Sequence, residues 1–240
     1  MTQEASEGGV AIEADSFGRA GAYSGPRPKI LFRPFESAEP VAPLLQRLRH
    51  PIFSFLRMRP IIAQHTRAEH ECLLRWARGR RQVVEIGVAE GASACALREA
   101  MSPDGALYLI DPFHLSRMRS INALRRAAHS AVGRHGTCKV AWIEDFSQRV
   151  AADWSQPIDL LFVDGDHDEA AVLRDWSDWS PHITPRGVAL FHDSRVFEKG
   201  WTTEEYGPVR VVNRLFRLGG AAGWTIAEEV DSVVVVMRSK

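Results

Sequence analysis

Five short apolar runs, separated by segments of helical periodicity, constrain the fold of this chain more than any other feature of its sequence. The runs are rich in β-branched or large apolar side chains and occupy residues 83–86, 106–110, 140–143, 158–163 and 188–191. Helical patterns separate them at residues 93–101, 116–132, 148–154 and 169–179. Before the first run, Thr66 to Glu69 match a capping box that opens a further helix. Alternation at this spacing is typical of βαβ units, so it predicts an α/β fold with a doubly wound, mostly parallel sheet.

The two ends of the chain follow other patterns. Residues 208–218 have the pattern of one helix, and residues 224–227 and 233–237 have the pattern of two strands joined by a short turn. This antiparallel hairpin brings the expected sheet to seven strands. Residues 1–45 are rich in Gly, Pro, Glu and Ser with little periodicity, and we expect them to form an N-terminal extension. Residues 46–240 are then expected to form one domain.

Charge and cysteine content exclude several classes of partner. The chain has 30 basic and 30 acidic residues, so no net charge draws it to nucleic acid or to an anionic membrane surface. Residues 1–15 lack the basic start and apolar run of a secretory signal, and no later stretch has the uninterrupted apolar length of a membrane span. The three cysteines are far apart and form no CxxC pair, which predicts buried thiols rather than a disulfide framework or a zinc site. We therefore expect a cytoplasmic protein without nucleic-acid or membrane partners.

A glycine loop follows the first apolar run, at Gly87 and Gly91. Its GxxxG spacing departs from the GxGxxG fingerprint of dehydrogenases, and absent side chains let the backbone approach a ligand closely. The second run ends at Asp111, where a carboxylate can accept both hydrogen bonds of a ribose diol. The third is followed by Asp145 and Phe146, which are placed to meet the edge and face of an adenine. Each feature alone equally fits a tight turn or a helix cap, but three successive strand ends in register favour a nucleoside-type site.

Four motifs make the chain resemble a known family. They are Val83-Val-Glu-Ile-Gly-Val-Ala-Glu-Gly91, Leu109-Ile-Asp111, Leu160-Leu-Phe-Val-Asp-Gly-Asp-His167 and Gly187-Val-Ala-Leu-Phe-His-Asp193. Over about residues 65–195 the chain resembles the class I, S-adenosylmethionine-dependent methyltransferases, specifically the bacterial sugar and macrolide-sugar O-methyltransferases. It is also similar to the mycobacterial enzymes that methylate mannose polysaccharides. The resemblance implies a Rossmann-like methyltransferase fold and S-adenosylmethionine as cofactor. It implies that the methionine part is held by Glu85, Gly87, Gly91 and Ser93, the ribose by Asp111, and the adenine by Asp145 and Phe146.

Two aspartates that follow neighbouring apolar runs form a candidate metal site. Asp164 follows the run at 158–163, and Asp193 follows the run at 188–191. Neighbouring strands of a parallel sheet lie about 4.8 Å apart, so side chains at their carboxyl ends can converge on one ion. Hard oxygen ligands with open positions suit magnesium, or manganese, better than zinc. His192 and Glu144 are candidate further ligands.

A histidine beside this pair is the candidate general base. An aliphatic hydroxyl is barely ionised at neutral pH, so a methyltransferase that uses one must lower its pKa and accept its proton. His167 lies three residues after Asp164, in a turn that faces the same cleft, and the resemblance places the base there. His114 and His192 are alternative bases. Taken singly, each of these residues fits a structural role better, but two carboxylates at strand ends together with a histidine beside the cofactor cleft favour catalysis.

Two long loops at the same sheet edge suit a saccharide. Residues 112–119 carry His114 and arginines, and residues 197–206 carry Trp201, Tyr206 and carboxylates. Aromatic faces can stack on the C–H faces of a sugar while polar groups bind its hydroxyls, although Trp201 and Tyr206 equally suit a role in filling the fold.

The sequence therefore predicts a metal-dependent O-methyltransferase that acts on a hydroxyl of a small saccharide. The expected metal cofactor is Mg²⁺. A catechol or phenol O-methyltransferase is the closest alternative, and a non-catalytic cofactor-binding subunit and an NAD-linked oxidoreductase are alternatives from other classes. The basic, apolar segment before residue 60 predicts a homodimer. The sequence leaves open which hydroxyl is methylated and how long the acceptor is.

Overall fold

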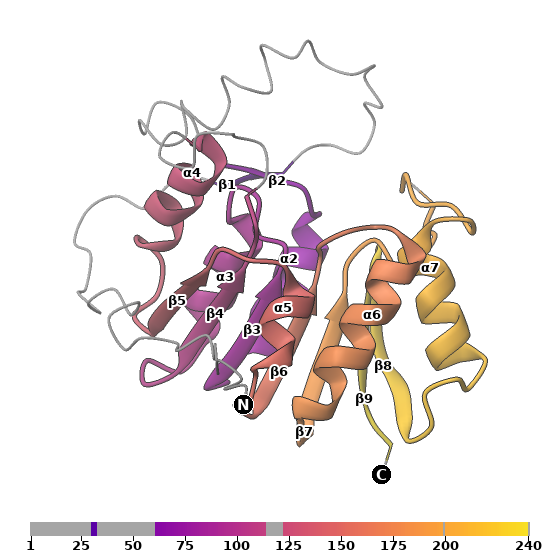
Figure 1. Cartoon of the computed structure of the whole chain (residues 1–240). Coiled ribbons are helices and arrows are strands. Elements are labelled where there is room, and N and C mark those ends of the chain that lie inside the picture. The colour runs from indigo at the N-terminus through magenta and orange to yellow at the C-terminus, as the bar shows by residue number, and fades with distance from the viewer. Residues whose placement is uncertain (1–29, 33–60, 114–121, 199, 240) are drawn as a thin grey trace, which may run out of the picture.

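A seven-stranded sheet lies at the centre of the structure, a computed structural model that describes residues 30–32, 61–113, 122–198 and 200–239 (Figure 1). Its strand order is β5-β4-β3-β6-β7-β9-β8. In chain order the strands are β3 (Gln82–Ile86), β4 (Ala106–Ile110), β5 (Lys139–Ile143), β6 (Ile158–Val163), β7 (Ile183–Phe191), β8 (Trp224–Val230) and β9 (Val233–Arg238). Except for residues 30–32, the predicted N-terminal extension and the segment on which the homodimer was predicted lie outside the described residues.

The pairing of the strands confirms the predicted topology. Strands β3 to β7 pair in parallel, while β9 pairs antiparallel with both β7 and β8. Strand β3 lies between β4 and β6, so the chain winds outward in opposite directions from this point. Open α/β sheets bind ligands in the crevice that such a reversal leaves at the carboxyl ends of the strands.

Helices cover both faces of the sheet. One face is covered by α2 (Arg67–Ala77), α3 (Ala92–Ala100) and α4 (Ala123–Val132). The other is covered by α5 (Ser147–Ala152), α6 (Glu169–Trp179) and α7 (Gly207–Val212), which lie in front of the sheet in Figure 1. A 3₁₀ turn (Ser180–His182) follows α6, and α7 continues as a π-helical turn (Asn213–Arg217), where the sequence predicted one uninterrupted helix.

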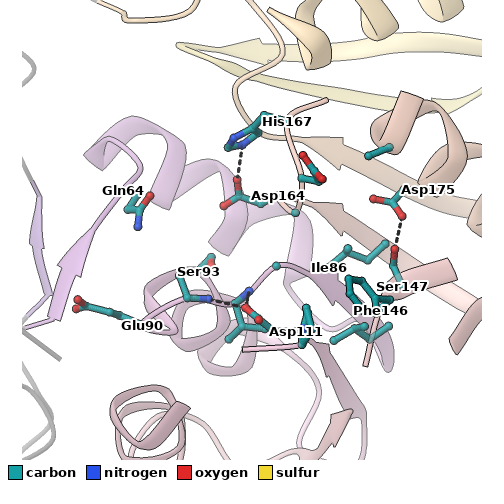
Figure 2. Close-up of a pocket in the computed structure, with 18 of the residues that line it drawn as sticks. Gln64, Ile86, Glu90, Ser93, Asp111, Phe146, Ser147, Asp164, His167 and Asp175 are labelled. Carbon is teal, nitrogen blue, oxygen red and sulfur yellow. Dashed lines mark hydrogen bonds and ion pairs between the residues drawn. The ribbon is translucent and has the colours of Figure 1, made fainter. Parts of the chain in front are cut away.

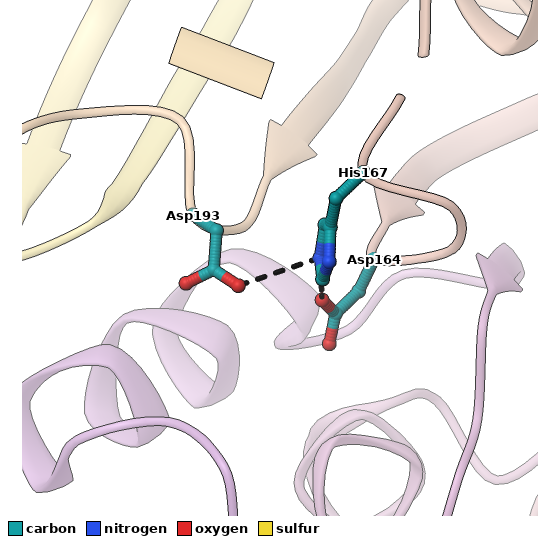
Figure 3. Close-up of side chains that lie close together, drawn as sticks. All are labelled: Asp164, His167 and Asp193. Carbon is teal, nitrogen blue, oxygen red and sulfur yellow. Dashed lines mark ion pairs between the residues drawn. The ribbon is translucent and has the colours of Figure 1, made fainter. Parts of the chain in front are cut away.

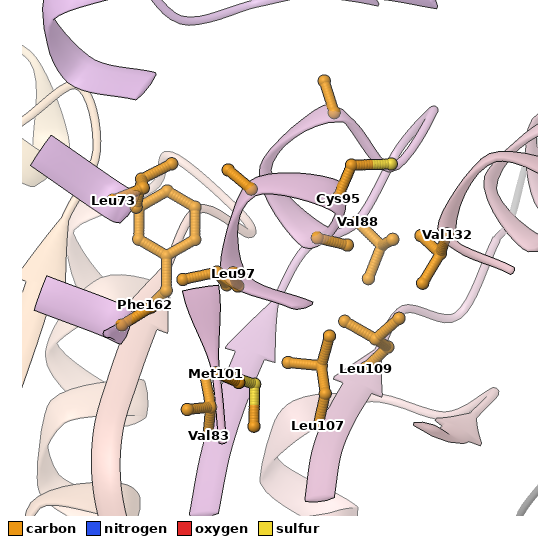
Figure 4. Close-up of a cluster of buried hydrophobic side chains, with 14 of the residues drawn as sticks. Leu73, Val83, Val88, Cys95, Leu97, Met101, Leu107, Leu109, Val132 and Phe162 are labelled. Carbon is orange, nitrogen blue, oxygen red and sulfur yellow. The ribbon is translucent and has the colours of Figure 1, made fainter. Parts of the chain in front are cut away.

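The apolar runs are continuous because both faces of the strands are buried. Successive side chains of a strand point to opposite faces, so Val83 and Phe162 pack with α2 and α3, while Val84 and Val163 pack on the other side. Figure 4 shows the first of these layers, in which Leu73 and Leu97 meet the strand side chains. The second layer contains three buried tryptophans: Trp154, Trp176 and Trp179. All three cysteines are buried thiols, as predicted.

Two very short strands and a capped helix bring the start of the described chain to the sheet. Strand β1 (Ile30–Phe32) pairs in parallel with β2 (Ile61–Ala63). The predicted capping box then begins α2: the Oγ1 of Thr66 accepts a hydrogen bond from the backbone N–H of Glu69, and the Glu69 carboxylate accepts one from the N–H of Thr66. Across the described ranges, no helix combines the length and the apolar character that a bilayer span requires.

Candidate active site

A cavity of about 510 Å³ opens at the carboxyl ends of β3, β4 and β6. Its volume lies in the range of small-molecule and cofactor sites. Figure 2 shows Gln64 and Glu90 at one end of this cavity and Phe146, Ser147 and Asp175 at the other. Six of the predicted site residues line it: Gly87, Ser93, Asp111, Phe146, Asp164 and His167.

The glycine loop needs its glycines for close backbone approach. Gly87 has a φ of +85°, and a Cβ there would lie 2.1 Å from the backbone carbonyl oxygen of Asp164. Gly91, at φ +81°, begins α3, and a Cβ there would lie 3.2 Å from the Cα of Ala128 in α4. Only glycine adopts such angles at low cost, so these two positions let the loop pass directly against the end of β6 and the side of α4.

Asp111 shapes the glycine loop as well as lining the cavity. Its Oδ2 accepts hydrogen bonds from the backbone N–H groups of Val88, at 2.9 Å, and Ala89, at 3.1 Å. Its Oδ1 accepts a third from the N–H of Phe113, at 2.7 Å. A carboxylate has about four acceptor sites, so capacity remains for a ligand hydroxyl.

Glu85 lies behind the loop rather than on the cavity wall. It is fully buried, and the Oγ of Ser93 donates a hydrogen bond to its Oε1. Within the described part of the chain its Oε2 has no hydrogen-bond partner. Burial raises the pKa of Glu85 well above its ordinary value. Ser93 lines the cavity and Glu85 does not, so the geometry places Ser93 between this carboxyl and a bound ligand.

The adenine end contains residues that the sequence predicted and residues that it did not. Phe146 lines the cavity, and the Asp145 carboxylate beside it accepts hydrogen bonds from the N–H of Phe146 and from Arg149. Ser147 follows directly after the predicted Asp145 and Phe146, whereas Asp175 was not predicted. The Oγ of Ser147 donates to Asp175, whose pKa burial raises to about 6. Asp175 comes from the middle of α6, where no strand-end pattern marks it.

Asp164 and Asp193 come together at the ends of β6 and β7, as the sequence predicted. Asp164, Asp193 and His167 each contribute one potential ligand atom, and these three atoms all lie within 4.8 Å of one another (Figure 3). His167 Nε2 is 3.8 Å from Asp164 Oδ1 and 3.4 Å from Asp193 Oδ2. Asp193 has a φ of +52°, a strained conformation for a residue other than glycine, of the kind that gathers at functional sites. Two carboxylates and an imidazole that converge in this way could hold a magnesium or manganese ion.

The electrostatics of this cluster favour the charged forms of Asp164 and of the two histidines, whereas burial raises the pKa of Asp193 above its ordinary value. The nearby Asp164 carboxylate raises the pKa of His167 above its ordinary value, and its effect outweighs that of burial. Burial alone would lower the pKa of His192, but Asp164, Asp193 and Glu69 around it raise that pKa well above its ordinary value. His192 and His167 together hold the pKa of Asp164 below its usual range, although burial alone would raise it.

The other predicted ligands and bases have different outcomes. His192 Nδ1 lies 3.0 Å from Asp164 Oδ1 and 3.2 Å from Asp193 Oδ2, so it contacts the pair directly. Glu144 forms an ion pair with Arg125 at the end of β5 and does not belong to the cluster. His114 and the arginines of the loop at 112–119 lie outside the described residues.

Two aromatic side chains border the acid pair on the outer side. The indole N–H of Trp201 donates to Asp193 Oδ1 at 3.3 Å, and 48% of Trp201 is exposed. The Tyr206 ring lies 5.3 Å from the His167 ring and 6.2 Å from the Trp201 ring, measured between centroids. The loop after β7 therefore places exposed aromatic surface next to the candidate base.

Comparison with known proteins agrees with the fold. Residues 84–194 match a protein family described as a methyltransferase domain. The chain is similar in structure to the O-methyltransferase TomG from Streptomyces achromogenes, solved with S-adenosylmethionine, at 18% identity and a TM-score of 0.52 over 80% of this chain and 89% of that one. A methyltransferase from Geobacter sulfurreducens gives 19% identity and a TM-score of 0.51 over 85% and 92% of the two chains. The N-methyltransferase NodS from Bradyrhizobium japonicum gives 19% and 0.50 over 72% and 96%. These likenesses confirm the predicted fold.

A curated relative matches only a short stretch. The uncharacterized protein y4gI from Sinorhizobium fredii is 45% identical over 49 residues, which are 20% of this chain. The matched stretch spans 5% of that relative's length, so it carries nothing about the activity of the whole protein.

Proposed function

We propose that this chain carries a class I, S-adenosylmethionine-dependent methyltransferase domain and is therefore an enzyme. We propose further that it is a metal-dependent O-methyltransferase that acts on a sugar hydroxyl. One observation carries the proposal: Asp164, Asp193 and His167 converge beside the cavity at the carboxyl edge of the sheet. An amine is nucleophilic once it is deprotonated and needs no cation for this, whereas a hydroxyl gains both from a cation that lowers its pKa and from a base that takes its proton.

The cofactor is proposed to lie along the cavity. The glycine loop and Ser93 would hold its methionine part, Asp111 its ribose, and Phe146 its adenine, with Asp145 supporting the turn before α5. This assignment follows the order in which β3, β4 and β5 end along the sheet.

The chemistry divides between the bound groups and the side chains of the chain. S-adenosylmethionine supplies an activated methyl group, and a divalent cation supplies positive charge that lowers the pKa of the acceptor hydroxyl. Asp164 and Asp193 would hold the cation, and His167 would take the hydroxyl proton at Nε2, the ring atom that faces both carboxylates. A cation held by the two carboxylates would offset their effect on the pKa of His167 and so favour the neutral imidazole, which can accept the proton.

The acceptor is proposed to be a neutral saccharide, such as a mannoside, that lies against Trp201 and Tyr206. Exposed aromatic faces close to carboxylates suit a sugar ring, because its C–H faces stack while its hydroxyls form hydrogen bonds. A catechol is the alternative acceptor, since two adjacent hydroxyls can also approach a cation. The cytoplasmic location and the homodimer that the sequence predicts stay predictions.

The acceptor class is tested by methyl transfer from radiolabelled S-adenosylmethionine, in the presence of Mg²⁺, to a panel of mannosides of increasing length, to simple catechols and to simple amines. We expect labelled methyl ethers of one or more mannosides, and we expect His167→Ala to lose turnover while it still binds S-adenosylhomocysteine by calorimetry. Turnover of catechols alone would replace the sugar with a phenol. Transfer only to amines would contradict O-methylation.

A further inference from the structure

Glu69 is a fully buried carboxylate that reaches the acid pair from a distant part of the sequence. Its place in the sequence is explained by the capping box, in which its Oε2 accepts a hydrogen bond from the N–H of Thr66 at 2.7 Å. A helix cap works at the protein surface and does not require burial. Buried glutamates are rare unless they are paired, so a second role for this carboxylate must lie in its other contacts.

Those contacts lead into the candidate metal site. Glu69 Oε1 accepts hydrogen bonds from the backbone N–H of Ser232, at 2.8 Å, and from its Oγ, at 2.6 Å. The same Ser232 Oγ lies 3.3 Å from Asp193 Oδ1. Glu69 Oε2 lies 3.5 Å from His192 Nε2. Glu69 thus contacts His192 directly and Asp193 through one hydroxyl.

His192 connects Glu69 to both members of the acid pair. Its Nε2 faces Glu69, and its Nδ1 lies 3.0 Å from Asp164 Oδ1 and 3.2 Å from Asp193 Oδ2. The ring is 4% exposed. An imidazole is rigid, so a partner that fixes one ring nitrogen also fixes the direction of the other.

We propose that Glu69 is a positioning residue for the acid pair: it holds the His192 ring with Nδ1 on Asp164 and Asp193, and it steadies Asp193 through Ser232. The inference rests on the proposed function, because a cation at the acid pair is part of that proposal. Outer partners that orient ligating groups in this way typically change metal affinity by about 10–100-fold when they are replaced.

The competing explanation is that Glu69 only caps α2 and ties the helix to the turn between β8 and β9. Thr66 offers a matched control for it. The Oγ1 of Thr66 caps the N–H of Glu69 at 3.0 Å and donates to Asp231 Oδ2, in that turn, at 2.7 Å. Thr66→Ala therefore removes the cap and a turn contact and leaves the carboxylate beside His192 in place.

The test is Mn²⁺ binding to the full chain, measured by electron paramagnetic resonance of free Mn²⁺, with no turnover required. We expect Glu69→Gln, which keeps size and an acceptor oxygen for Ser232, to bind Mn²⁺ about 10–100-fold more weakly than the wild type. We expect Thr66→Ala to keep wild-type Mn²⁺ affinity while its melting temperature falls. Calorimetry with S-adenosylhomocysteine verifies that each variant is folded.

Each outcome decides between the two explanations. Wild-type Mn²⁺ affinity in a folded Glu69→Gln variant would overturn the inference and leave Glu69 a purely structural residue, with the proposed metal site intact. A wild-type protein that binds no Mn²⁺ would overturn the metal site and the inference together. If Glu69→Gln does not fold, Glu69→Asp replaces it, because a shorter side chain keeps the charge but withdraws it from His192. Unchanged Mn²⁺ affinity in that variant would equally overturn the inference.

Discussion

Asp175 at the adenine end of the cavity gives a stability prediction with a defined pH dependence. Burial raises its pKa from 3.8 to about 6, against the opposing effect of the hydrogen bond from Ser147. In this range of pH the folded protein holds a proton that the unfolded chain has released, so stability falls as pH rises from about 4 to about 6. A difference of roughly two pKa units corresponds to about 3 kcal/mol of destabilisation once the carboxyl is ionised in the folded state.

Asp175→Asn removes this ionisation and keeps an oxygen that can accept the hydrogen bond from Ser147. We expect the variant to be more stable than the wild type by about 3 kcal/mol at pH 8 and by only about 0.5 kcal/mol at pH 4, where the wild-type carboxyl is protonated in the folded protein.

Urea denaturation of both proteins at the two pH values measures this difference. Every other titrating group is common to both proteins, so its contribution cancels. A stability difference between the variant and the wild type that is the same at pH 4 and pH 8 would refute the reasoning.

Three further predictions test the loop, the base and the core. Gly87→Ala should abolish S-adenosylhomocysteine binding, because a Cβ would lie 2.1 Å from a backbone oxygen. Gly79→Ala is the control, because φ is +71° there but the new Cβ would lie in open space. This variant should lose only about 1–2 kcal/mol of stability and should bind S-adenosylhomocysteine normally. Equal binding by the two variants in calorimetry would contradict the close approach at Gly87. His167→Ala should lower kcat by about 10²–10⁴-fold with Mn²⁺ affinity unchanged, as expected for a base. Loss of Mn²⁺ binding would make His167 a ligand instead. Burial raises the pKa of all three thiols, to about 12 for Cys72, so Ellman's reagent should label them only after unfolding. Rapid labelling of the native protein would argue against the buried positions of Cys72, Cys95 and Cys138.

Much of the sheet could be predicted from the sequence because strands that are buried on both faces consist of continuous runs of apolar residues. Residues 106–110, 158–163 and the helix at 169–179 have the limits that the patterns indicate. Strand β7 begins at Ile183, whereas the sequence pattern predicted a start at Val188. The pattern missed the first residues because Thr184 to Arg186 are polar or proline and partly or fully exposed, so they do not resemble a buried strand. Strands β1 and β2 have three residues each, too short for any periodicity to mark them.

The candidate site could be predicted only where it follows strand ends. Asp164 and Asp193 belong to neighbouring parallel strands, so topology alone brings them together. Asp175 and Glu69 follow no such rule, since both lie on helices and approach the site through tertiary packing. The sequence marked Glu69 through its capping box, but a capping pattern does not indicate that the same carboxylate is buried against His192.

Methyl transfer by this chain is proposed to require a divalent cation held by Asp164 and Asp193. The most direct measurement is turnover of the best acceptor from the panel, by enzyme freed of metal with a chelator and then given Mg²⁺. We expect turnover to disappear with the chelator, to return with Mg²⁺, and to be absent in Asp164→Asn and Asp193→Asn variants that still bind S-adenosylhomocysteine. Undiminished turnover in the presence of chelator would contradict the account.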